Sequence, residues 1–77
     1  MKINIEGLSP DEAFVVKWQY GLLGDFEAAL AICLTRADHK NFDRLEVAFP
    51  TQAGGYWRYI NTPGWWDEVE KKAEIEE

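Results

Sequence analysis

One stretch of this chain, Tyr56–Asp67, constrains its fold more than any other part. It reads Tyr-Trp-Arg-Tyr-Ile-Asn-Thr-Pro-Gly-Trp-Trp-Asp and holds five of the eleven aromatic residues of the chain. Aromatic side chains bury the largest apolar areas, and a Pro-Gly pair is typical of a tight bend. We therefore expect this stretch to form a corner that closes a small core.

The length of 77 residues predicts a single small domain that spans 1–77. This is close to the lower size at which one core sustains folding without disulfides or metals, so self-association would help to bury apolar surface. The one cysteine, Cys33, excludes an internal disulfide and a cysteine-based zinc site. Its apolar neighbours predict a small buried hydrophobic residue.

Two further observations predict the compartment. No apolar run approaches the roughly 20 residues that a membrane-spanning helix needs, and we recognise no signal peptide. A small chain without disulfides suits a reducing environment. We expect a cytoplasmic protein that does not contact a membrane.

Capping signals predict the first two helices. Ser9 and Glu12 form a capping-box pattern around Pro10, which suits a first helical position. Gly24 is expected to end this helix and Asp25 to cap the next. Apolar residues at helical spacing then predict a second helix that ends near 36–38 and is the central one. Its stripe comprises Phe26, Ala28, Ala29, Leu30, Ile32, Cys33 and Leu34, while the first helix presents Phe14, Val15, Trp18, Leu22 and Leu23.

The region 45–60 is open to two interpretations. The residues from Leu45 to Phe49 alternate as in a strand, so a hairpin with Tyr56–Ile60 is one alternative. The spacing of apolar residues also fits two short helices, and we favour this interpretation. The first would be capped by Asp38 and present Phe42, Leu45, Ala48 and Phe49; the second would present Tyr56, Tyr59 and Ile60 on one face.

The last helix is predicted to start with Thr62 as its cap and Pro63 in its first position. Trp65, Trp66, Val69 and Ala73 would form its inner side. The predicted fold class is therefore all-α, a compact orthogonal array of four to five short helices. An extended arm at 1–8 precedes the array and a frayed tail at 74–77 follows it. The alternative is an α+β fold with a hairpin at 45–60.

These residues also carry a resemblance to a known group. The series Phe42, Arg44-Leu45, Phe49-Pro50, Tyr56, Tyr59 and Thr62-Pro-Gly-Trp-Trp66 resembles small uncharacterised proteins of tailed phages and prophages. The resemblance covers roughly 12–72 and implies a phage gene product that acts inside a bacterial cell, without a catalytic motif or cofactor. Ala53-Gly54-Gly55 stands where that group is expected to have a charged pair, which leaves the continuity of the fourth helix open.

The residues offer little for catalysis. His39 is the only histidine, and Asp38 and Asp43 beside it do not complete the three or four ligands of a stable metal site. Gly54-Gly55 lacks the lysine and the spacing of a phosphate loop. Exposed carboxylates near lysines, such as Asp67 and Glu70, have no reason to act as an acid–base pair. We expect no enzyme activity, no metal and no cofactor.

The net charge of −6 is concentrated at one end. Residues 67–77 contribute six acids and two lysines, or −4, and residues 1–66 contribute eight acids and six bases, or −2. This balance opposes direct nucleic-acid binding, which needs a basic face, but it suits a basic protein surface. A solvated helix end is the alternative explanation of the acidic tail.

Trp57 and Arg58 lie off the face of Tyr56 and Tyr59, and Trp and Arg are enriched at binding hot spots. The alternative for Trp57 is packing on Trp65 or Trp66. We expect a partner-binding surface of Trp57, Arg58, Asp67, Glu68, Glu70 and Glu74 that engages a host protein, with inhibition of a defence complex such as a CRISPR effector as its most specific form. The alternatives are a homo-oligomer that sequesters a nucleotide-like ligand and a phage structural or replication accessory protein.

Overall fold

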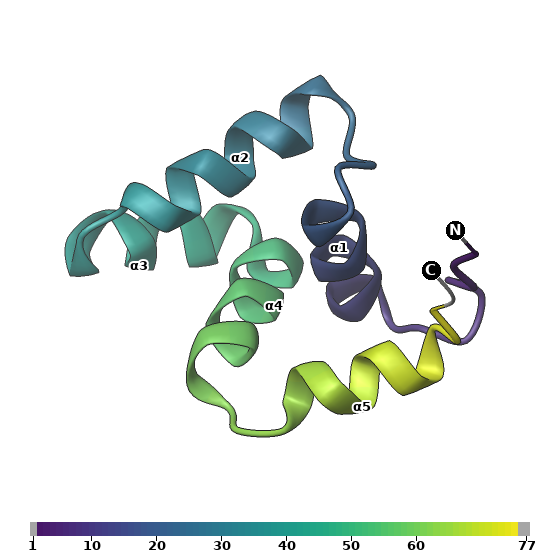
Figure 1. Ribbon diagram of the computed structural model, residues 1–77. Helices are drawn as coiled ribbons and strands as arrows, with labels where there is room; N and C mark the ends of the chain where they lie inside the picture. Colours follow the sequence, from purple (N-terminus) through teal and green to yellow (C-terminus); the bar gives the residue numbers. More distant parts are fainter. Residues whose placement is uncertain (1, 76–77) are drawn as a thin grey trace.

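A computed structural model describes residues 2–75 of the chain. Within them lie five helices and no strand: α1 (Pro10–Gln19), α2 (Asp25–Arg36), α3 (His39–Ala48), α4 (Pro50–Asn61) and α5 (Trp65–Lys72). Figure 1 shows α4 in the middle of the array, with α2 and α5 on opposite sides of it. The all-α prediction is confirmed, and the hairpin alternative at 45–60 is wrong, because these residues belong to α3 and α4.

The central helix is α4 and not α2, as the sequence had predicted. α4 packs against each of the other four helices, and its most extensive contacts are with α1 and α3. α2 packs through Leu30, Ala31 and Leu34, which are buried. Cys33 lies outside this buried side and is exposed, so its predicted burial is wrong. The apolar stripe of α2 is wider than the single face that its neighbours cover.

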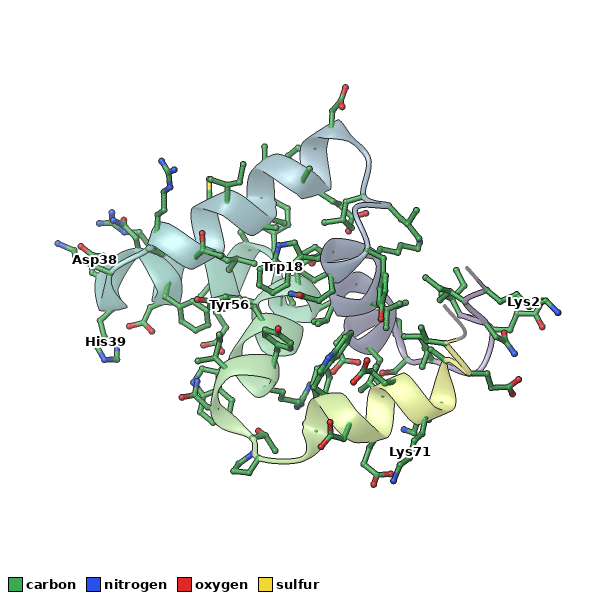
Figure 2. All side chains as sticks on the ribbon, viewed as in Figure 1. Lys2, Trp18, Asp38, His39, Tyr56 and Lys71 are labelled. Carbon is green, nitrogen blue, oxygen red and sulfur yellow. The ribbon has the colours of Figure 1, made fainter. Side chains whose placement is uncertain are left out.

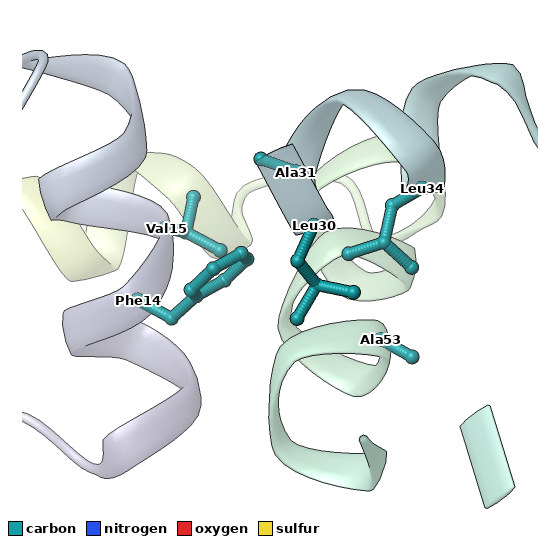
Figure 3. Close-up of a cluster of buried hydrophobic side chains, with 6 residues drawn as sticks. All are labelled: Phe14, Val15, Leu30, Ala31, Leu34 and Ala53. Carbon is teal, nitrogen blue, oxygen red and sulfur yellow. The ribbon is translucent and has the colours of Figure 1, made fainter. Parts of the chain in front are cut away.

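Two clusters of buried side chains form the core. The larger joins α1, α2 and α4 and comprises Phe14, Val15, Leu30, Ala31, Leu34 and Ala53 (Figure 3). The smaller joins α1 and α5 and comprises Val16, Val69 and Ala73. Trp65 and Trp66 pack against both clusters, as the predicted corner requires. No helix among residues 2–75 is both long and apolar enough to cross a membrane.

A glycine sets the distance between α1 and α4. A Cβ atom at Gly55 would lie 2.7 Å from the backbone oxygen of Asp11 and 3.2 Å from Cγ2 of Val15. The two backbones can approach this closely only because Gly55 has no side chain. α4 runs through Gly54 and Gly55 without interruption, which resolves the question of its continuity. Ile60, which was expected on its inner face, is 57% exposed.

Several helix boundaries differ from the predicted ones. α1 ends at Gln19, and Gly21 adopts the left-handed region with φ of 69°, so Leu22 lies outside the helix and is exposed. Asp25 is the first residue of α2, while Gly24 occupies the cap position. The early end of α1 has a clear reason: Gly21 adopts the left-handed turn that ends a helix.

α5 starts at Trp65, two residues later than predicted. Thr62 is the C-cap of α4, and Gly64, with φ of 80°, is the N-cap of α5. Thr62 therefore caps no following helix, because the Pro63-Gly64 turn lies between it and Trp65. The other predicted start signals are confirmed. The capping box of Ser9 and Glu12 is present, and the Asp38 carboxylate accepts from the Asn41 backbone N–H at 2.8 Å.

The ends of the described chain lie side by side (Figure 1). The backbone N–H of Asn4 donates to the carbonyl of Ala73 at 2.8 Å. Glu74 follows with a φ of 50°. Of the tail expected at 74–77, Glu76 and Glu77 lie outside the described residues, as does Met1 of the expected arm.

Candidate protein-binding surface

The last two turns of α4 divide its aromatic residues between the core and the surface. Tyr56 and Tyr59 turn inward to Trp18 of α1, with ring centres 5.7 and 5.4 Å away. Trp18 and Tyr56 lie near each other in Figure 2. Trp57 and Ile60 are 49% and 57% exposed. They are three residues apart and therefore neighbours on the helix surface.

The corner brings this pair close to the start of α5. The Trp66 ring meets the Tyr59 ring edge-on at 5.4 Å, which fixes the first turn of α5 against the end of α4. The Asn61 side chain donates to the Trp57 carbonyl at 3.1 Å and so closes the last turn of α4. An open depression lies at the junction, lined by Tyr59, Ile60, Asn61, Thr62, Pro63, Gly64, Trp66 and Asp67. Ile60 and Asp67 thus share one surface feature.

Arg58 has an intramolecular role that the sequence did not reveal. Its guanidinium donates to the Asp11 carboxylate of α1, although half of the Arg58 side chain remains exposed. Burial raises the pKa of Asp11, but the Ser9 hydroxyl, the Glu12 backbone N–H and the Arg58 charge outweigh it and hold that pKa below its usual range. Arg58 is therefore tied to the α1–α4 contact, and its charge is already compensated.

The predicted acidic residues occupy different sides of α5. Asp67 and Glu68 are exposed and Glu70 is half-buried. At about 100° per residue, Asp67 and Glu70 lie on neighbouring sides, whereas Glu68 and Glu70 are about 160° apart. Glu68 lies 3.9 Å from Lys71, an exposed pair of little energetic weight. Among residues 2–75, Asp67, Glu70 and the exposed Glu74 form no ion pair.

One lysine of α5, Lys72, binds the carboxylate of the buried Glu12. Lys72 donates to Oε2 of Glu12 at 2.9 Å, and the Ser9 backbone N–H donates to Oε1 at the same distance. Glu12 is only 8% exposed. Burial raises the pKa of Glu12, but these hydrogen bonds and the Lys72 charge lower it by more, so that pKa lies below its usual range. With Lys72 occupied, the outer surface of α5 is more acidic than its composition indicates.

The other candidate residues do not converge. His39 is exposed in the first position of α3, far from the corner (Figure 2). No group of three or more His, Cys, Asp or Glu within residues 2–75 could hold a metal ion. Gly54 and Gly55 lie inside α4, and Gly55 serves the helix contact.

Taken together, the structure brings Trp57, Ile60 and Asp67 to one region, which we call the α4–α5 surface, with Glu70 on the adjoining side of α5. It separates Arg58 and Glu68 from them. The sequence analysis did not predict Ile60 as a surface residue. The signal was present, because Trp57 and Ile60 have the three-residue spacing of neighbours on a helix.

Comparisons of the chain with protein-family models, with curated proteins and with solved structures find no match.

Proposed function

We propose that this protein is a non-catalytic binding domain that engages a basic surface of a partner protein through its α4–α5 surface. The observation that carries the proposal is the exposure of Trp57 and Ile60 beside the Asp67 carboxylate, which forms no ion pair within residues 2–75. Large apolar anchors surrounded by polar residues are the usual composition of a protein interface.

The charge of the surrounding helix selects the partner. Asp67, Glu70 and Glu74 add negative charge to the outer part of the C-terminal segment, while Lys72 is held by Glu12. Charges at the rim of an interface mainly steer association and exclude partners of the same sign. A partner with a basic patch around an apolar pocket would match both parts of the surface.

The resemblance to phage proteins supplies a setting for the proposal. The partner would then be a bacterial host protein, and inhibition of a defence complex would be the most specific form of the function. A CRISPR effector, which holds nucleic acid in a positively charged channel, is the first purified protein to test. The acidic surface would compete with nucleic acid for that channel.

The experiment begins with site-specific crosslinking in bacterial cells. A photoreactive amino acid at Asn61, on the outer side of α4, should yield one discrete protein adduct. The same amino acid at Val47, which is 86% exposed on α3, is the control and should not yield that adduct. Equal adducts from both positions would contradict the proposal.

Binding of the identified partner is then measured with purified proteins. Trp57→Ala should weaken binding by roughly thirtyfold or more, equivalent to about 2 kcal/mol, because a hot-spot side chain is lost. Asp67→Lys with Glu70→Lys should weaken binding and reduce its dependence on salt. Val47→Ala is the control and should bind normally. Unchanged affinity of folded Trp57→Ala protein would overturn the proposed surface.

A further inference from the structure

α2 has a second apolar face that the described chain leaves largely exposed. Its one ring contact within residues 2–75 is between Phe26 and Phe49, whose ring centres are 5.7 Å apart. The inner side of α2 is buried in the core through Leu30, Ala31 and Leu34. On its other side Phe26 is 65% and Ile32 54% exposed, and Ala29 and Cys33 are exposed as well. Figure 1 shows α2 along the margin of the array. We call Phe26, Ala29, Ile32 and Cys33 the outer face of α2.

Opposite charges lie at the two ends of this outer face. Asp25 is the first residue of α2 and Arg36 the last. Eleven residues separate them, which at about 100° per residue brings them to within about 20° of the same direction and about 16 Å apart. Both are exposed, and neither forms an ion pair within residues 2–75. The face therefore reads acid, apolar centre, base along the helix axis.

We infer that the outer face of α2 binds the same face of a second copy of this chain, with the two helices antiparallel. A two-fold axis between positions 30 and 31 would place Asp25 of each copy opposite Arg36 of the other. Contacts in such an isologous interface occur twice, so both charges of each copy are paired. The apolar centres then face each other, and the small side chain of Ala29 near the axis lets the helices approach closely.

The charges select this arrangement over the parallel one. Parallel helices would place Asp25 against Asp25 and Arg36 against Arg36, and like charges at an interface are unfavourable. The two charges of the face cancel, so the face offers no excess of positive charge for nucleic acid or anionic lipid. A copy of the same face is the partner that satisfies both ends.

The size of the face sets the expected affinity. α2 has 12 residues and is about 18 Å long, so its contact falls at the small end of specific interfaces, below about 1,200 Å² in total. We expect a reversible dimer with a dissociation constant of about 1–500 μM. α2 and α5 lie on opposite sides of the molecule (Figure 1), so the dimer would leave both α4–α5 surfaces accessible. The inference does not depend on the proposed function.

Sedimentation equilibrium of the full chain from about 1 μM to 1 mM tests the dimer directly. The wild type should change from monomer to dimer over this range. Ile32→Glu places a carboxylate in the apolar centre twice per dimer and should weaken association at least about a hundredfold. Trp57→Ala should leave association unchanged, which separates this interface from the α4–α5 surface. A wild type that stays monomeric at 1 mM would overturn the inference.

Reversal of the charges tests the antiparallel geometry. Asp25→Arg or Arg36→Asp alone should weaken the dimer about tenfold, because each introduces two like-charge contacts. The double variant should recover affinity to within about threefold of the wild type. These changes oppose the dipole of α2, so circular dichroism must first show each variant to be folded. A folded double variant that is weaker than both single variants would overturn the antiparallel arrangement.

Discussion

α1 and α3 have the same length of 10 residues but differ completely in burial. α1 buries Glu12, Phe14, Val15 and Val16, whereas no residue of α3 is buried. The valines show the contrast best: Val15 and Val16 are 0% exposed and Val47 is 86% exposed. α1 is contacted by α2, α4 and α5, while α3 packs mainly on α4. Burial here depends on how many neighbours a helix has.

The polar contacts of the two helices differ in the same direction. Asp11 and Glu12 of α1 pair with Arg58 of α4 and Lys72 of α5, which lie far away in the sequence. The polar contacts of α3, from Asn41 to Asp38 and from Arg44 to Asn41, are local. Long-range contacts form only in the folded chain, so α1 is part of its most stable unit. We expect α3 to open first.

The largest predicted effect tests this contrast with one substitution in two places. Val15→Ala should lower the free energy of unfolding by about 2–3 kcal/mol, because it removes two buried methyl groups and leaves a cavity. Val47→Ala should change it by less than about 0.5 kcal/mol, since the side chain is exposed and alanine favours a helix. Urea denaturation followed by circular dichroism measures both values.

The result would also show whether α3 is covered in solution. A loss of more than about 1 kcal/mol for Val47→Ala would mean that Val47 contacts something that this monomer does not contain. The comparison between α1 and α3 would then be wrong. Repeating the measurement at several protein concentrations would separate an intermolecular contact from an internal one.

The second prediction concerns the two adjacent glycines of α4. Gly55→Ala should destabilise the protein by about 1–3 kcal/mol, because the new Cβ meets the Asp11 carbonyl and forces α1 and α4 apart. Gly54→Ala is the matched control. Its Cβ would meet only the Arg58 side chain, at 3.8 Å, so the better helix propensity of alanine should stabilise by about 0.5–1 kcal/mol.

A combined variant would sharpen this prediction. Val15→Ala makes room at one atom near Gly55, but the closest atom, the Asp11 backbone oxygen, stays in place. The double variant Val15→Ala with Gly55→Ala should therefore be less stable than either single variant. Similar thermal stability of Gly54→Ala and Gly55→Ala protein would show that α1 and α4 are not held at this distance.

The sequence predicted the helices well because their start signals are local. Ser9 with Glu12 and Asp38 with Asn41 form caps within four residues of chain, and these caps are present. The position of Gly55 against Asp11 could not be predicted, because it depends on how two helices cross. The prediction that the apolar stripe of α2 is buried was wrong for the same reason. This stripe is wider than the side of α2 that its neighbours cover.

The candidate site was only partly predictable. The exposure of Trp57 followed from helical geometry once 50–61 formed one helix. The pairing of Arg58 with Asp11 and of Lys72 with Glu12 did not, because the partners are separated by 47 and 60 positions. In these contacts the charge of Arg58 is neutralised by Asp11, and Lys72 pairs with Glu12 and not with the acidic residues of α5. Net charge by segment is therefore an incomplete measure of the surface that a partner meets.

The smallest predicted effect concerns the polar side of the comparison between α1 and α3. The pKa values of Asp11 and Glu12 lie below their usual range, so both carboxylates stabilise the folded state at neutral pH. This contribution is complete above the unfolded pKa values of about 4 and is lost as pH falls through the lower folded values. Glu12→Gln should cost about 1 kcal/mol at pH 7, because the buried Glu12 side chain loses its charge and its ion pair with the half-exposed Lys72. The difference from the wild type should shrink between about pH 5 and pH 2.

Asp43→Asn, an exposed change on α3 with no ion pair within residues 2–75, is the control and should leave stability at pH 7 within about 0.5 kcal/mol. If Glu12→Gln matched Asp43→Asn in urea denaturation at every pH, the pair between α1 and α5 would add nothing to the stability of α1.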